Sequence, residues 1–154
     1  MNKLLIFNGL AACFALLASC ENNFLIEEKQ PVHGENWTYS DSLRFEFEVT
    51  DTSKRYNLYV DFDHAADFPT ENIYVRIGTI FPSGKRLLKQ RSFLLADPSG
   101  AWLGDCSGGQ CSVRVLLQES TFFQETGKYT LIFEQWMRQD SLPGIRAVGL
   151  AVEK

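Results

Sequence analysis

Leu43-Arg44-Phe45-Glu46-Phe47-Glu48-Val49 decides the fold of this chain, because apolar and charged residues alternate along it without a break. Successive side chains of a β-strand point to opposite faces, so this stretch predicts a strand with one dry face and one wet face. The segment from Tyr56 to Phe62 repeats the pattern, with Leu58 and Val60 on the apolar face. Two such segments close together indicate a sheet with one buried side.

The same signal recurs along the rest of the chain, between clusters of turn residues such as Phe81-Pro82-Ser83-Gly84 and Asp97-Pro98-Ser99-Gly100. No long stretch carries a capped helical stripe. About eight strands in one small domain predict an all-β fold, an antiparallel β-sandwich of immunoglobulin-like or jelly-roll-like type. The remaining predicted strands cover residues 72–80, 85–96, 112–118, 127–138 and 146–153.

The amino-terminal segment carries targeting information. Lys3 precedes an apolar stretch that ends at Leu17-Ala18-Ser19-Cys20, and a basic start, an apolar core and a small-residue cleavage site make a secretory signal. The apolar run is too short to span a membrane. A cysteine directly after the cut is typical of a lipoprotein, whose acyl chains hold it on a membrane. We therefore expect a signal peptide over residues 1–19 and lipidation of Cys20.

The next residues, 20–34, combine charge and turn formers without periodicity, and predict a lipidated tether. Residues 35–154 then form the β-sandwich domain. The net charge of the chain is −4, and loss of Lys3 with the signal makes it one unit more negative. Such mild acidity argues against a nucleic-acid partner.

Two cysteines remain after processing, because Cys13 leaves with the signal and Cys20 takes the lipid. Cys106 and Cys111 flank a short spacer of Ser, Gly and Gln, and export to an oxidising compartment favours a disulfide between them. Closing so short a loop contributes about 2 kcal/mol by the loop-entropy estimate. Zinc would need two further ligands, and a redox pair is more often spaced Cys-x-x-Cys.

Candidates for chemistry are few. Asp61, Asp63, His64 and Asp67 lie close together in the sequence, but a calcium loop would add a glycine and a bidentate glutamate at defined positions. We expect a solvated polar loop and no metal site. The chain has two histidines and no Gly-x-Ser-x-Gly nucleophile elbow, so no catalytic residue is assigned. A pair of carboxylates, as in a hydrolase, stays open because the fold sets their spacing.

Two features could instead serve binding. The basic run Lys85 to Arg91 could attract anionic lipid or sugar, although we expect it to be the wet face of a strand whose Leu88 and neighbours point inward. We expect each tryptophan in the core, with an exposed platform for glycan or protein as the alternative. Trp102 lies in the loop-like Gly100-Ala101-Trp102-Leu103-Gly104, and is therefore the best candidate for an exposed contact.

Several short motifs follow one another in an order that resembles a known family. Together with the lipobox cysteine, they make the chain similar to the GldH family, gliding-motility lipoproteins of the Bacteroidetes, over Trp37 to Glu153. They include Asp51-Thr52, Tyr56-Asn57-Leu58, Asn72-Ile73, Pro82-Ser83-Gly84, the tryptophan loop, Gly127-Lys128-Tyr129, Met137-Arg138 and Leu142-Pro143-Gly144-Ile145. The Cys106–Cys111 hairpin departs from the usual pattern of that family.

The resemblance implies a cell-envelope lipoprotein that is needed for surface gliding and is associated with the machinery that secretes and moves surface adhesins. It implies no catalytic residue. We expect no cofactor, and as partners the membrane and other gliding and secretion proteins of the envelope. The expected location is a bacterial membrane, the outer membrane in our hypothesis, on its periplasmic side or at the cell surface. Ser42 and Ser141 lie in Asp-Ser-Leu triplets that resemble the O-glycosylation sequon of that phylum.

Two other functions stay open at this point. The first is a carbohydrate-binding surface lipoprotein, which two coplanar tryptophans on a solvent-facing sheet would favour. The second is an envelope hydrolase, which would need a cleft with converging carboxylates of shifted pKa.

Overall fold

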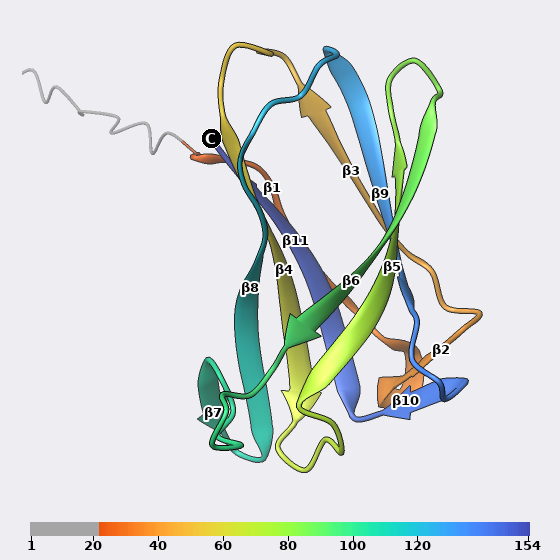
Figure 1. Cartoon of the computed structure of the whole chain (residues 1–154), viewed down its shortest axis with the longest axis vertical. Helices are drawn as coiled ribbons and strands as arrows, with labels where there is room; N and C mark the ends of the chain where they lie inside the picture. The colour runs from red at the N-terminus through yellow and green to blue at the C-terminus, as the bar shows by residue number, and fades with distance from the viewer. Residues whose placement is uncertain (1–21) are drawn as a thin grey trace, which may run out of the picture.

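The computed structural model describes residues 22–154, so the predicted signal peptide and Cys20 lie outside the described residues. Nearly all of the described chain is β-structure (Figure 1). The elements are β1 (Phe24–Pro31), a 3₁₀ turn η1 (His33–Glu35), β2 (Asn36–Thr38), β3 (Leu43–Val49), β4 (Tyr56–Ala65), β5 (Asn72–Ile80), β6 (Arg86–Leu94), β7 (Asp105–Ser107), β8 (Gln110–Thr121), β9 (Gly127–Gln135), β10 (Ser141–Pro143) and β11 (Ile145–Glu153).

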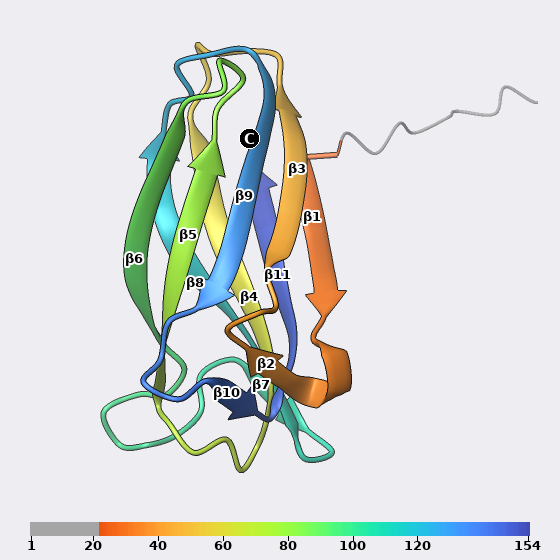
Figure 2. The ribbon, with the colours of Figure 1, turned by 90° about the vertical axis from the view of Figure 1, so that its right-hand side faces the viewer.

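Two antiparallel sheets pack face to face, as Figure 2 shows, and the predicted β-sandwich is confirmed. The larger sheet has the order β1-β11-β4-β8-β7, and the smaller has the order β3-β9-β5-β6. The short strands β2 and β10 pair with each other at one end. Within residues 22–154, no helix is long and apolar enough to cross a membrane.

The apolar residues that alternate with charged ones in the sequence form the core of the sandwich. Along β3, buried and exposed residues alternate from Leu43 to Val49, as the sequence predicts. Phe45 packs on Phe133 of the neighbouring β9, with ring centroids 5.3 Å apart. Fully burying one such aromatic side chain stabilises the fold by about 2 kcal/mol relative to leaving it exposed. Trp37, which is fully buried, closes the core near the β2–β10 end.

The tether expected over residues 20–34 is not free of structure, because Phe24–Pro31 forms β1 and pairs with β11 from Phe24↔Glu153 to Pro31↔Ala147. Leu25 and Ile26 of this edge strand pack against the core, but the next three residues, Glu27 to Lys29, are all exposed and charged. An edge strand can therefore lack the apolar alternation by which a strand is recognised in a sequence. The folded domain begins about ten residues earlier than the sequence predicts.

The two long sides of the sandwich differ. On one side β1 lies next to β3, and the Gln30 side-chain amide donates to the Arg44 carbonyl across 2.7 Å. On the other side stand the edge strands β6 and β8, which are not hydrogen-bonded to each other. One side is therefore closed by contacts between the sheets, and the other is open.

Candidate functional site

Trp102 is held against the body of the domain. Its indole Nε1 donates to the Ala66 carbonyl across 2.8 Å, and its ring meets the His64 ring edge-on at 4.7 Å between centroids. The side chain is half-buried, so part of the indole stays open to solvent. A contact by this loop stays a prediction, and it would use the exposed neighbour Leu103 together with one part of the indole.

The loop around Trp102 is fixed by its own turn chemistry. The Asp97 carboxylate accepts hydrogen bonds from Ser99 and from the Ala101 backbone, and these bonds hold its pKa below the usual range. Gly104 has φ +77°, and a Cβ there would lie 2.1 Å from the Ser112 carbonyl oxygen. Only glycine fits so close to β8 in this conformation.

The loop is also tied covalently. A disulfide joins Cys106 to Cys111, whose Cα atoms lie 4.0 Å apart, and the predicted bridge is confirmed. It closes the β7–β8 hairpin, in which Cys106 pairs with Cys111. The bridge therefore links the end of the Trp102 loop to the first residues of β8.

The acidic run after Asp61 does not gather at one point. Asp61 and Asp63 face outward from β4 and bind Arg114 and Lys29, whereas His64 points into the core and its Nδ1 bonds the Ala65 carbonyl. The alternation of a strand separates these side chains onto opposite faces. In the part of the chain that the structure describes, no three His, Cys, Asp or Glu residues form a metal-binding group.

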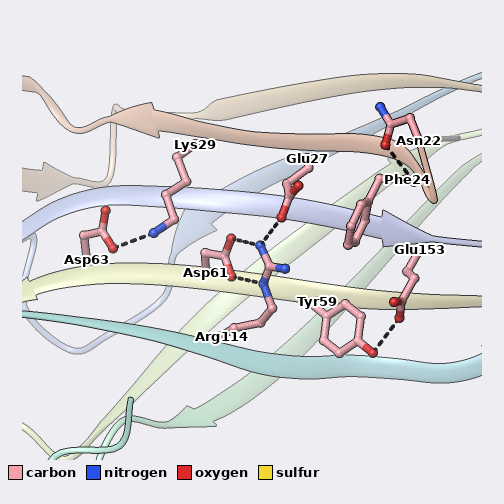
Figure 3. A network of polar contacts seen from close by, with 9 residues as sticks. All are labelled: Asn22, Phe24, Glu27, Lys29, Tyr59, Asp61, Asp63, Arg114 and Glu153. Carbon is pink, nitrogen blue, oxygen red and sulfur yellow. Dashed lines mark hydrogen bonds and ion pairs between the residues drawn. The ribbon is translucent and has the colours of Figure 1, made fainter. Parts of the chain in front are cut away.

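A network of ion pairs crosses the outer face of the five-stranded sheet, and Figure 3 shows its members. We call it the Arg114 network: Glu27, Lys29, Asp61, Asp63 and Arg114. The Arg114 guanidinium donates to both Asp61 oxygens, at 2.7 and 2.8 Å, and to Glu27 at 2.9 Å. Lys29 reaches Asp63 at 2.7 Å. Asp61, above all, raises the pKa of Arg114, which stays charged at any working pH.

Glycine makes room for that network. Gly149 lies between Lys29 and Asp61 in the sheet, and a Cβ on it would stand 2.7 Å from Lys29 Cγ and 2.9 Å from the Glu28 carbonyl. Without a side chain on β11 at this point, side chains from both neighbours can lie across the strand. The charges are matched within the fold, so the network holds neighbouring strands together and offers little to a ligand.

The open side of the sandwich contains a cleft of about 550 Å³ between the two sheets. We call it the inter-sheet cleft. Its buried apolar floor comes from both sheets and includes Leu58, Ile77, Tyr129 and Leu131. The basic residues at its rim come from β6 and the turn before it: Lys85, Lys89 and Arg91.

The direction of the β6 side chains corrects the sequence prediction. Phe93 is buried between the sheets and shares a face with Leu87, Lys89 and Arg91, because side chains two residues apart point the same way. Leu88, expected to point inward, is 61% exposed on the opposite face. The predicted wet face of β6 therefore looks into the inter-sheet cleft.

The basic residues of the cleft are unmatched. Within residues 22–154, neither lysine nor the arginine lies within 4.0 Å of a carboxylate oxygen. The one carboxylate that lines the cleft is Glu125, which accepts hydrogen bonds from the Ser83 backbone and hydroxyl. An apolar floor with an excess of positive charge suits binding of an anionic, partly apolar partner.

Sequence reasoning missed an aromatic surface on the outer face of the four-stranded sheet. Trp136 is 41% exposed, and Tyr39 and Tyr74 beside it are exposed to a similar degree. Arg76 lies over the Trp136 ring, 4.1 Å from its centroid, and also binds Glu134. Tyr129, Leu131 and Phe133 are buried, so the alternation of the predicted strand over residues 127–138 puts Trp136 on the opposite face, and that phase was the available signal.

A family model described as GldH lipoprotein matches residues 25–152. The chain belongs to the GldH lipoprotein family. It is 27% identical over 146 residues to the "Gliding motility lipoprotein GldH homolog" of Christiangramia forsetii, covering 90% of this chain and 89% of that protein. It is 26% identical over 146 residues to the "Gliding motility lipoprotein GldH" of Flavobacterium johnsoniae, covering 90% of each.

One solved structure is similar at the level of its general shape. A carbohydrate-binding module specific for non-crystalline cellulose superposes with a TM-score of 0.40 at 11% identity, over 82% of this chain and 70% of that module. So low a score carries no argument about function. The GldH match, which spans nearly all the described residues, is the comparison that bears on this chain.

Proposed function

We propose that this GldH-family chain is a lipid-anchored, non-enzymatic accessory component of the gliding motility machinery and of the protein secretion associated with it. The observation that carries the proposal is the family match over residues 25–152. Both curated relatives carry gliding motility in their names and align over about 90% of their length. The partners would be other gliding and secretion proteins of the envelope.

The anchor supplies the location in this proposal. A lipoprotein family implies lipid attachment, and Cys20 follows a signal-like segment two residues before the described chain begins. Two or three acyl chains give stable membrane anchoring where one does not. We place the domain on the outer membrane, with β1 at the membrane-proximal end of the chain.

Two surfaces of the domain are available for protein contacts. The Trp102 loop is a rigid one, because the Asp97 turn and the disulfide hold its two ends. The inter-sheet cleft is a charged one. Neither contains a histidine or a thiol that could take part in catalysis: His64 lies behind Trp102 in the core, and His33 lies in η1 at the other sheet edge.

The carbohydrate alternative has weak support in the geometry. Trp37 is fully buried, Trp102 is half-buried, and the Trp136 ring has one face covered by Arg76. Tyr39 is tilted by 53° to Trp136, so the two rings do not form a flat platform. Sugar stacking needs an open aromatic face, which this arrangement largely withholds.

Deletion of the gene in its own host, with spreading scored where that host glides, tests the proposal. We expect loss of colony spreading and reduced delivery of surface adhesins, with both restored by the wild-type gene on a plasmid. Normal spreading together with normal surface-protein secretion in the deletion strain would show that the proposal is wrong. Fractionation of the membranes of the complemented strain locates the protein.

Complementation with cysteine variants tests the anchor. Cys20→Ala should abolish incorporation of labelled palmitate and should fail to restore spreading, because the domain would no longer be held on the membrane. Cys13→Ala, a matched change inside the signal, should restore both. Lipid labelling that survives in Cys20→Ala would refute the assignment of the anchor.

A further inference from the structure

The inter-sheet cleft is bounded by two strand edges that lack a backbone partner. β6 pairs with β5 alone, and β8 pairs with β7 only over the three residues Gln110 to Ser112. Beyond that point, the edge of β8 has no neighbouring strand among the described residues. Both strands line the same cleft. Free N–H and C=O groups along an edge are a template for an added strand.

The side chains beside this edge define what could bind there. Leu87, Lys89 and Arg91 point from β6 toward the cleft, and Leu117 lines it from β8. Apolar floor and basic rim thus lie within one opening. Every second side chain of an added strand points to the cleft face, so a peptide whose cleft-facing positions carry both apolar and acidic residues could meet both.

The charge of the cleft contrasts with that of the chain. The whole chain carries a net charge of −4, yet the cleft has three cations without an internal carboxylate partner. Cations at an edge keep two copies of the same chain from pairing, because equal charges would meet. The same cations favour a strand of opposite charge, so they select between partners.

We infer that the inter-sheet cleft binds an extended acidic segment of a partner protein, which adds to the free edge of β6. Its backbone pairs with β6, its apolar side chains rest on the floor between the sheets, and its carboxylates meet Lys85, Lys89 and Arg91. Nine residues, the length of β6, span about 30 Å when extended. An acyl chain would fill the floor but would leave the strand edges unpaired, which is why a peptide fits better than a lipid.

The inference does not depend on the proposed function, because it concerns binding by the purified protein. The full-length lipidated chain, in nanodiscs of zwitterionic lipid, is mixed with a fluorescent nine-residue peptide, Val-Thr-Glu-Thr-Val-Thr-Glu-Thr-Val, which presents both Val and Glu on one face of a strand. Fluorescence anisotropy gives the affinity. We expect binding that weakens as salt rises, and at least about tenfold weaker binding of the peptide with Gln in place of Glu.

Paired variants locate the site. Lys89→Glu/Arg91→Glu reverses two charges on the cleft face and should weaken binding by about tenfold or more. Arg86→Glu/Gln90→Glu changes two residues of β6 on its opposite face and should leave binding within about twofold. If the charge-reversed protein fails to fold, Lys89→Gln/Arg91→Gln replaces it, with the same order of effects expected.

Hydrogen exchange distinguishes strand addition from electrostatic binding without backbone pairing. Peptide binding should slow exchange of alternate β6 amides, which point away from β5 in the free protein. Equal affinity for the Glu and Gln peptides, or protection confined to other strands, would overturn the inference. It would also fall if the peptide fails to bind while anionic phosphatidylglycerol vesicles bind in a manner that Lys89→Glu/Arg91→Glu abolishes.

The outcomes stay separate from those for the proposed function. A protein that binds the peptide but whose deletion leaves gliding and secretion normal would support the cleft and refute the motility role. If deletion abolishes gliding but the purified protein does not bind the peptide, the motility role is supported and the inference about the cleft is refuted.

Discussion

The outer face of the five-stranded sheet and the inter-sheet cleft both carry basic side chains, but only the first face neutralises them. Arg114 meets Asp61 and Glu27, and Lys29 meets Asp63, each within 3 Å. Lys89 and Arg91, on the strand at the other edge of the sandwich, meet no carboxylate in residues 22–154. Matched charge serves the fold, and unmatched charge is available to a partner.

The difference has a simple physical origin. Across β4, β11 and β1, small residues such as Gly149 and Ala151 leave room for long side chains to reach one another over the strand between them. The β6 cations instead stand at an edge, with the open side of the sandwich in front of them and no further strand to supply carboxylates (Figure 2). Substitutions in the Arg114 network should therefore lower the free energy of unfolding more than substitutions of the β6 cations.

The largest effect is expected for arginine removal. Arg114→Met leaves the Asp61 carboxylate, whose side chain is 4% exposed, without its cation. Breaking such a pair by deleting one partner should cost about 3 kcal/mol of the free energy of unfolding at neutral pH, less than a fully buried pair because Arg114 itself reaches solvent. Arg91→Met in the cleft should change it by less than about 0.5 kcal/mol.

Urea denaturation of the disulfide-bonded proteins measures both values. The double variant Asp61→Leu/Arg114→Met provides a control, since removing both charges should recover much of the loss. Similar losses for Arg114→Met and Arg91→Met would mean that the two regions do not differ as we describe.

A smaller effect, about 2 kcal/mol, is expected for Gly149→Ala, because the new Cβ would lie 2.9 Å from the Glu28 carbonyl and β1 would have to shift. Its matched control is Gly78→Ala on the outer face of the other sheet, where a Cβ meets nothing closer than 3.8 Å. There the loss of chain entropy in the unfolded state should stabilise the protein by about 0.5 kcal/mol. Thermal unfolding measures both variants: the midpoint should fall for Gly149→Ala and rise for Gly78→Ala. If both midpoints shift in the same direction, Gly149 is not crowded as we describe.

Much of the fold could be predicted from the sequence, and the reason lies in burial. β3, β4, β5 and β9 each bury one face, so their apolar residues alternate and reveal them. β1 could not be found in this way, because the consecutive charged residues Glu27, Glu28 and Lys29 interrupt any apolar alternation along this edge strand. The disulfide was predictable because the two cysteines are five positions apart.

The candidate site could be predicted less well. The phase of β6 was misjudged because Leu87 and Leu88 are adjacent, and only the pairing of Phe93 with Ile73 decides which of them faces the cleft. Phe93, four positions after Lys89, was the available signal. That Arg114 has a carboxylate partner and Arg91 has none depends on contacts between residues far apart in the chain, such as Asp61 and Arg114, which a single sequence does not reveal.

The smallest effect tests the end of the sheet that carries the Arg114 network. The Tyr59 hydroxyl donates to Glu153 across 3.0 Å, and this bond together with burial raises the pKa of the phenol above its ordinary value near 10. A raised pKa in the folded state contributes stability that is complete below the unfolded pKa and is lost as the pH rises through the folded one. Tyr59→Phe should therefore cost about 0.5 kcal/mol at pH 7, and its difference from the wild type should narrow as the pH rises above about 10. Tyr74→Phe, on the exposed aromatic surface, removes a hydroxyl with no hydrogen bond to the described residues and should cost nothing measurable at pH 7. Urea titrations at each pH give these differences, and a gap for Tyr59→Phe that widens in alkali would show that the phenol is not held by Glu153.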